Sequence, residues 1–166
     1  MKARGIVRVL RQSGVRNAAR LRLFRIDESG QETLVVSSAL LTKVAATAIC
    51  RLFHGAFPAR PDIEALEKIF RAPGKTAWAG FTACSAAAAA ERACAQHRIG
   101  DARGVLVLIT LSTTSSIIDD MRRVMDVVHR HSGAGATVSA MVSYDECLND
   151  QTRVEILLTG MPARAA

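Results

Sequence analysis

The segment GVLVLITL at residues 104–111 decides the fold. From Val105 to Leu111 it is almost continuously apolar, and Gly104 and Ser112 flank it. Such runs, without polar alternation, are typical of strands that are buried on both faces or lie at the centre of a sheet. We therefore expect a central strand here.

Downstream of this strand, residues 116–131 have the pattern of an amphipathic helix. Acidic residues lie in its first turn and basic residues in its last, which is the order that the helix dipole favours. Residues 137–142 and 153–159 predict two more strands. The polar linker between them, which includes Tyr144 and Asp145, predicts a turn.

Two patterns stand at the start of the chain. Residues 20–36 alternate around a polar turn and form a candidate hairpin. Ser37 or Ser38 is then expected to cap a helix that is apolar on nearly every face and ends near His54.

Between these patterns and the central strand, three more elements are expected. Asp62 caps a helix with apolar residues at spacings of three and four. Residues 75–84 predict a strand, in which Gly80 indicates a bulge or a close backbone approach. Ser85 begins an alanine-rich helix that continues to about His97. The resulting order of elements predicts an α+β fold, a two-layer sandwich of a sheet and helices.

Composition and length fit one compact domain. The chain has 166 residues, of which 49% are hydrophobic and 22% charged, and is too short for two full domains. No uncharged apolar run reaches the roughly 18 residues of a membrane span, and the first residues lack the pattern of a secretion signal. We expect a soluble, cytoplasmic protein.

The cysteines predict no metal site. Cys50, Cys84, Cys94 and Cys147 are separated by 34, 10 and 53 residues, and no pair has zinc-finger spacing. The four histidines do not complete a site either. We expect buried or half-buried thiols in a reducing cytosol.

The excess positive charge lies in the first 26 residues. Of the net charge of +7, these residues contribute eight basic side chains and no acid, whereas the remainder has 14 basic and 15 acidic residues. Such a segment attracts nucleic acid or an anionic surface. The arginines that we select as candidate contacts are Arg16, Arg20, Arg22 and Arg25. A solvated charged face is the alternative, because no aromatic residues are interleaved for base stacking.

Three segments carry a family resemblance. They are ARGVLVLIT at residues 102–110, GATV at 135–138 and RVEILLTG at 153–160. With the helix after the first of them, they resemble the carboxy-terminal domain of FtsZ, the bacterial relative of tubulin. Residues 129–161 follow the family pattern without a gap, and residues 62–84 resemble the stretch after the FtsZ central helix. The similarity covers residues 39–161, about three quarters of the chain.

The resemblance implies a tubulin/FtsZ C-terminal-domain-like fold, with a mixed four-stranded sheet backed by helices. FtsZ binds GTP in an amino-terminal domain, for which the 38 residues before position 39 are too few. The fragment Gly74-Lys75-Thr76 is not a phosphate-binding loop, because Ile69 stands where its first glycine belongs. We therefore expect no cofactor, no GTPase activity and no other catalysis.

The loop at residues 60–65 matches the family loop that contacts the next subunit of a filament and supplies acids to its nucleotide. Asp62 falls on the first acidic position, but Ala65 occupies the second and Arg60 replaces a polar amide. Glu64 is adjacent to the lost acid, but one helical residue turns a side chain by about 100 degrees. We interpret Arg60, Asp62 and Glu64 as a degenerate binding loop, in which Asp62 acts as a helix N-cap rather than in catalysis.

Two functions remain open at this point. The first is a non-enzymatic, FtsZ-like interaction module of bacterial cell division, which forms homo-oligomers or associates with an FtsZ-type filament and caps or modulates its polymerisation. The second is binding of nucleic acid or an anionic surface through the basic segment. We divide the chain into a basic extension with a candidate hairpin (1–38), an FtsZ-like domain (39–161) and a tail (162–166).

Overall fold

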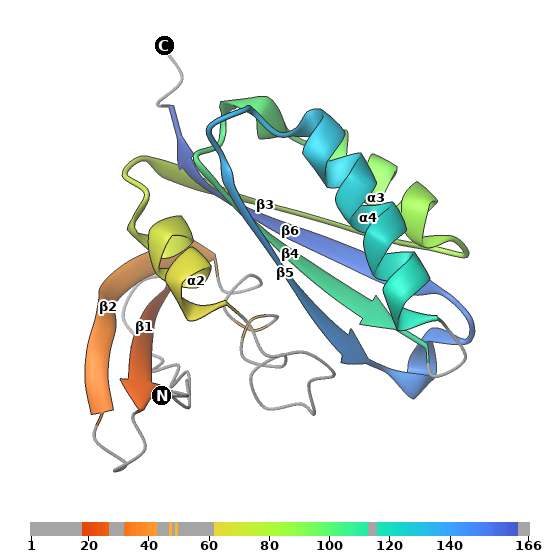
Figure 1. The fold of residues 1–166 in the computed structure, drawn as a ribbon, viewed down its shortest axis with the longest axis horizontal. Coiled ribbons are helices and arrows are strands. Elements are labelled where there is room, and N and C mark those ends of the chain that lie inside the picture. Colours follow the sequence, from red (N-terminus) through yellow and green to blue (C-terminus); the bar gives the residue numbers. More distant parts are fainter. Residues whose placement is uncertain are drawn as a thin grey trace.

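The computed structural model describes residues 18–26, 32–42, 47, 49, 62–112 and 116–162 (Figure 1). The strands are β1 (Ala18–Ile26), β2 (Glu32–Thr42), β3 (Lys75–Ala83), β4 (Gly104–Leu111), β5 (Thr137–Tyr144) and β6 (Thr152–Met161). The helices are α2 (Ile63–Arg71), α3 (Ala86–Cys94) and α4 (Ile117–His131), with short 3₁₀ turns η1 (Ile99–Asp101) and η2 (Glu146–Leu148).

The larger sheet has four strands in the order β3-β6-β4-β5. β6 lies antiparallel to both β3 and β4, whereas β4 and β5 are parallel. The expected central strand is β4, and each of its eight residues is buried. The predicted α+β fold with a mixed four-stranded sheet is therefore confirmed.

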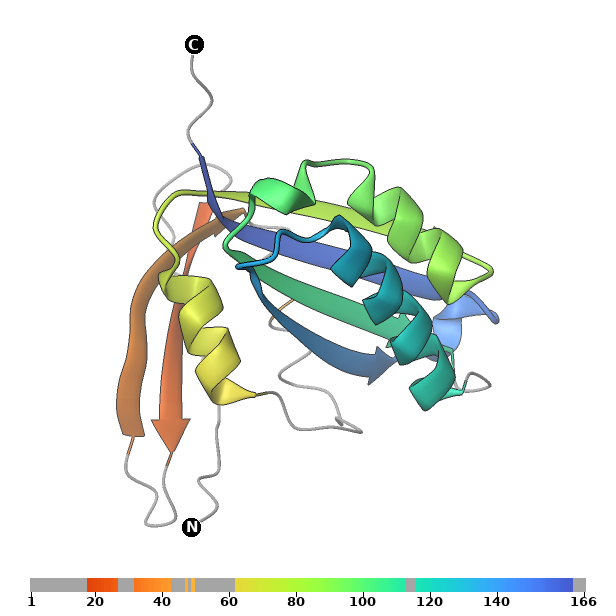
Figure 2. The same cartoon turned by 45° about the horizontal axis from the view of Figure 1, so that its top comes forward.

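Helices α3 and α4 cover one face of this sheet (Figure 2). Val105, Val107 and Ile109 of β4 are buried in the core beneath them. The buried side of α3 consists largely of alanines, and such small side chains let a helix axis approach its neighbours closely. The Oγ of Ser85 accepts a hydrogen bond from the N–H of Ala88 (3.1 Å), which caps the helix as expected.

Helix α2 lies on the opposite face, near the first residue of β4. The Thr159 hydroxyl donates a hydrogen bond to the carbonyl oxygen of Ile69 (2.6 Å) and so joins β6 to α2. A Cβ on Gly104 would lie 2.9 Å from the Ile69 Cα and would overlap the Thr159 hydroxyl. A glycine at position 104 therefore allows α2 to reach the sheet. Leu106 and Leu108 are fully buried on this face, so β4 is covered on both sides.

The amino-terminal hairpin is confirmed and is longer than predicted. β1 and β2 pair antiparallel, with Ala18 opposite Thr42 and Ile26 opposite Glu32. The helix predicted to begin at Ser37 or Ser38 is wrong over residues 37–42, which continue β2. Residues 39–42 pair with β1, whereas Ser37 and Ser38 lie at a shift in the register between the two strands. The pairing on both sides of this shift outweighs the preference of serine for a helix cap. The rest of that predicted helix lies outside the described residues, apart from the helical residues 47 and 49.

Three smaller predictions are corrected. The alanine-rich helix ends at Cys94 instead of near His97, and η1 follows it. No bulge lies at Gly80, which pairs regularly with Glu155, and the irregularity in β3 lies between Lys75 and Ala77. The alternative expectation of a close approach at Gly80 agrees with the Glu155 Cγ, which would lie 3.2 Å from a Cβ at this position. Tyr144 is the last residue of β5 rather than part of a turn, because it pairs with the last residue of β4.

Candidate interaction site at the two ends of the sheet

Asp62 is the N-cap of α2. Its Oδ1 accepts hydrogen bonds from the N–H groups of Glu64 (3.0 Å) and Ala65 (3.2 Å). Both bonds satisfy backbone donors that the first turn of a helix otherwise leaves without partners. The structure thus brings Asp62 and Glu64 to one helix end, with Glu64 exposed. Arg60, the third member of the predicted loop, lies outside the described residues.

The basic segment is described in part. Arg20, Arg22 and Arg25 lie on β1, where Arg20 pairs with Leu40 and Arg25 with Thr33. These three arginines are therefore positions of a single strand of the hairpin. Arg16 lies outside the described residues.

The four-stranded sheet has two ends of different chemistry. At the first, which we call the Gly104 end, β3, β4 and β5 begin and β6 ends. At the second, the Leu111 end, β4 and β5 finish and β6 begins. Because α4 runs from the Leu111 end back to the Gly104 end, its acidic first turn and its basic last turn lie at opposite ends.

Charge follows this division. The Gly104 end has six basic side chains against three acidic ones, whereas the Leu111 end has five acidic against three basic. At the Gly104 end they are Lys68, Arg71, Lys75, Arg98, Arg103 and Arg130, with Glu67, Glu91 and Asp101. At the Leu111 end they are Asp119, Asp120, Asp145, Glu146 and Asp150, with Arg122, Arg123 and Arg153. The described domain is therefore electrically polar along its strands.

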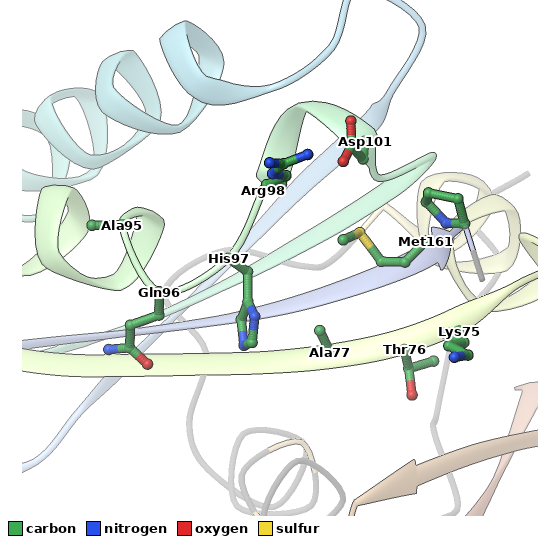
Figure 3. Close-up of a pocket in the computed structure, with 10 residues that line it drawn as sticks. Lys75, Thr76, Ala77, Ala95, Gln96, His97, Arg98, Asp101 and Met161 are labelled. Carbon is green, nitrogen blue, oxygen red and sulfur yellow. The ribbon is translucent and has the colours of Figure 1, made fainter. Parts of the chain in front are cut away.

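A groove of about 890 Å³ opens at the Gly104 end (Figure 3). The first residues of β3 form one side, and the segment from α3 to η1 forms the other. Its apolar lining comes from Ala77, Ala95, Met161 and Pro162. Lys75 and Arg98 provide positive charge at the groove, and Asp101 provides the opposing negative charge. Its volume lies in the range of about 300–1,000 Å³ that is typical of ligand pockets.

The groove runs beside the outer edge of β3, which is an edge strand. Two consecutive side chains of the α3–η1 segment bond to this edge: Gln96 Nε2 donates to the carbonyl oxygen of Gly80, and His97 Nε2 lies 3.0 Å from that of Trp78. Since a carbonyl only accepts, His97 must carry its proton on Nε2 in this contact. These bonds occupy two alternate carbonyls of the edge, which blunts it against pairing with another strand.

The Leu111 end presents apolar side chains to solvent. Among the described residues, Ile118 and Tyr144 are the large hydrophobic residues that are exposed, at 66% and 41%. Ile118 lies in the first turn of α4, and Tyr144 ends β5. Asp145 follows Tyr144 and caps η2 by accepting a hydrogen bond from the N–H of Cys147 (3.0 Å). Exposed apolar side chains beside acidic ones are typical of a contact surface.

An ion-pair cluster connects α3 to α4. The Nη2 of Arg130 donates to Oε1 of Glu91 (2.6 Å), and His131 Nε2 lies 3.0 Å from its Oε2. These contacts, that of His131 first, hold the pKa of Glu91 below its usual value. The cluster is exposed, so it fixes the packing of two helices rather than forming an enclosed reactive site.

The cysteines behave in two ways. Cys94 is buried, as predicted, and burial raises the pKa of its thiol to about 11. The prediction is wrong for Cys84 and Cys147, which are exposed: Cys84 directly follows the end of β3, and Cys147 is the middle residue of the 3₁₀ turn η2. Cys50 lies outside the described residues.

Sequence reasoning did not select the groove or the exposed apolar pair. For Ile118 the sequence does contain a signal. Adjacent residues of a helix point about 100 degrees apart, so Ile117 and Ile118 could not both face the sheet. Nothing comparable marks the groove, because Lys75, Arg98 and Met161 are brought together only by the pairing of β3 with β6 and by the position of η1.

No protein-family model matches the chain, and no curated protein matches it. Solved structures do match. An empty FtsZ dimer from M. jannaschii matches with a TM-score of 0.62 and 20% sequence identity, over 71% of this chain and 38% of that one. The fold is FtsZ-like. The M. jannaschii FtsZ W319Y mutant gives 0.59 and 18%, over 70% of this chain and 37% of that one.

TubZ from Bacillus thuringiensis serovar israelensis, in GDP-form protofilaments, has a TM-score of 0.48 at 9% identity, over 72% of this chain and 36% of that one. The chain thus spans well under half the length of the FtsZ chains that it matches. The segments 102–110 and 153–160 carried the predicted resemblance to FtsZ. Their strands are neighbours in one sheet, as that resemblance implies. In the described part of the chain, no helix has the length and apolar character of a membrane span.

Proposed function

We propose that this chain is a non-enzymatic, FtsZ-like interaction module that associates with itself or with an FtsZ-type filament and caps or modulates its polymerisation. The observation that carries the proposal is the FtsZ-like sheet backed by α4, with exposed Ile118 and Tyr144 at the Leu111 end. Exposed apolar groups of this kind stabilise an assembly when a partner buries them.

A binding role rather than catalysis is supported by the loop that would contact a nucleotide in the family. The Asp62 carboxylate already accepts two backbone hydrogen bonds, and Ala65 stands at the position of the second acid. A carboxylate held in this way has a structural use, the capping of α2. The proposal therefore assigns no GTPase activity to the chain.

Capping follows from the part of FtsZ that the chain matches. A polymer grows when each added subunit offers a fresh contact face to the next one. A unit that supplies one FtsZ-like contact face, without the nucleotide face, would occupy a filament end and prevent further addition. The proposal places the protein in the cytoplasm with such filaments.

Co-sedimentation tests this function. The chain is mixed with FtsZ from M. jannaschii under polymerising conditions with GTP, and the pellet is compared with that of the chain alone. The proposal predicts that the chain pellets with the filaments, or that it pellets alone as an assembly of its own. A chain that stays in the supernatant in both cases, and sediments as a monomer, contradicts the proposal.

Binding of a polyanion is the second candidate, and the placement of Arg20, Arg22 and Arg25 on one strand favours it. Nonspecific electrostatic binding weakens steeply with salt, because the released counterions lose their entropic advantage. A gel-shift assay with duplex DNA at low and moderate salt, using the wild type and a variant with these three arginines replaced by glutamate, tests this candidate. Binding that the charge reversal leaves unchanged would exclude it.

A further inference from the structure

We propose that the Leu111 end of one copy docks into the groove at the Gly104 end of the next, so that the chain assembles head to tail through Ile118 and Tyr144. This inference rests on the proposed function, because it names the partner as a second copy of the chain and names the two surfaces that meet.

The first argument is the position of the apolar groups. Ile118 and Tyr144 come from different elements, α4 and β5, and both lie at the Leu111 end. Tyrosine is among the residues that contribute most to protein contacts, since its ring buries a large area and its hydroxyl tolerates a wet rim. The Leu111 end therefore offers two side chains whose burial would stabilise a contact.

The second argument is the shape and lining of the groove. Its volume of about 890 Å³ is large enough to admit more than one side chain, and Ala77, Ala95, Met161 and Pro162 give it apolar walls. Gln96 and His97 occupy carbonyls of the β3 edge beside it, so insertion of side chains is favoured there over addition of a strand. The groove thus suits protruding side chains rather than an extended peptide.

The third argument is charge. The groove is lined by the basic residues Lys75 and Arg98. At the Leu111 end, the exposed acidic residues are Asp119, which follows Ile118 in α4, and Glu146, which lies in η2 just after Tyr144. A head-to-tail contact brings these opposite charges together, while a contact between two equal ends brings like charges together. Complementary charge at the rim selects the partner surface and raises the association rate.

The two surfaces lie at opposite ends of the same sheet, so the contact is heterologous. Contacts of this type leave a free surface at each end of every assembly and continue into open chains unless the rotation closes a ring. A twofold dimer would instead saturate at two copies. The dependence of the mean mass on concentration therefore distinguishes the two arrangements.

Sedimentation velocity of the full chain over a wide concentration range is the first test. The proposal predicts a mean mass that rises beyond that of a dimer with increasing concentration, and that falls at high salt because ions screen the rim charges. Tyr144→Ser should weaken the self-association about 30-fold, the size of one central contact residue. Because Tyr144 is 41% exposed and part of its ring packs on the domain, this change should lower the melting temperature without unfolding the chain, and circular dichroism verifies that the variant remains folded at the temperature of the experiment.

A charge swap tests the pairing of the two surfaces. Variant A carries Asp119→Lys and Glu146→Lys, and variant B carries Lys75→Glu and Arg98→Glu. Neither should self-associate, but an equimolar mixture should, since the reversed end of A meets the reversed groove of B. Asp126→Lys is the matched control: Asp126 lies seven residues after Asp119 on the same helix and is exposed, away from the Leu111 end.

Recovery of assembly in the mixture, with Asp126→Lys behaving as wild type, supports the proposal. A wild-type chain that stays monomeric, or a mass that saturates at a dimer, overturns it; so does a mixture of A and B that remains monomeric while the wild type assembles. The proposed function still holds after any of these outcomes if the chain pellets with FtsZ filaments. It is excluded only if the chain neither self-associates nor pellets with FtsZ filaments.

Discussion

Replacing Gly104 with alanine tests the packing that holds α2 against the sheet. Gly104 is the glycine of the segment ARG at residues 102–104, which carries the most specific part of the family resemblance. Its backbone is not in the left-handed region, so alanine is compatible with the local conformation. The added methyl group would contact the Ile69 Cα of α2 at 2.9 Å and overlap the Thr159 hydroxyl of β6.

Two opposing effects set the change in the free energy of unfolding for Gly104→Ala. Overpacking of a core typically costs about 1–3 kcal/mol, and it should act here because the Ile69 Cα is backbone and the Thr159 hydroxyl is held by its hydrogen bond to Ile69. Alanine also restricts the unfolded chain, which stabilises the folded state by about 0.4–1 kcal/mol. We expect a net loss of about 1–2 kcal/mol, which lowers the melting temperature of a chain of this size by about 2–8 °C.

Thermal and urea unfolding followed by circular dichroism measure this difference. Gly135→Ala is the matched control, since nothing lies within 4 Å of a Cβ at that position, and it should be neutral or stabilise the chain by about 0.4–1 kcal/mol. If Gly104→Ala proves as stable as Gly135→Ala, the close approach of α2 to β4 does not exist and the described packing is refuted.

Three further changes probe single contacts. Asp62→Ala removes both hydrogen bonds of the α2 cap and should cost about 1 kcal/mol in urea unfolding, whereas Asp62→Ser should keep most of it; equal loss in both would contradict the capping role. The pKa of Glu91 is lowered in the folded state, so its contribution is present above the ordinary carboxyl value of 4.5 and is lost as the pH falls through the lowered pKa. Melts of wild type and Glu91→Gln should therefore differ near neutral pH and converge in acid; a constant difference would contradict the ion pair. In a Cys50→Ser background, a thiol reagent should modify Cys84 and Cys147 in the native chain and Cys94 only on unfolding, and rapid labelling of all three would contradict the burial of Cys94.

The sheet and its helices were accessible from the sequence because their signals are local. The apolar run 104–111 indicates a strand covered on both faces, and the Asp62 and Ser85 caps mark where helices begin. The helix predicted from Ser37 or Ser38 failed for the opposite reason. Residues 39–42 are paired with β1, and a pairing partner some twenty residues away leaves no mark on local propensity.

The contact surfaces were less accessible than the fold. The groove depends on the register of β3 against β6 and on a 3₁₀ turn that the sequence did not reveal, so its lining residues are distant along the chain. The polar residues after Tyr144 predict a turn there, yet Tyr144 pairs in register with Leu111. The polarity of charge along the sheet emerges only when the direction of α4 and of each strand is known.

Polymerisation of M. jannaschii FtsZ followed by light scattering, with and without a several-fold molar excess of this chain, tests the central claim most directly. The account predicts that the chain changes the amplitude or the rate of the GTP-dependent signal, with a smaller effect for the Tyr144→Ser variant because the Leu111 end is altered. An unchanged scattering curve at the highest excess of wild-type chain would contradict it.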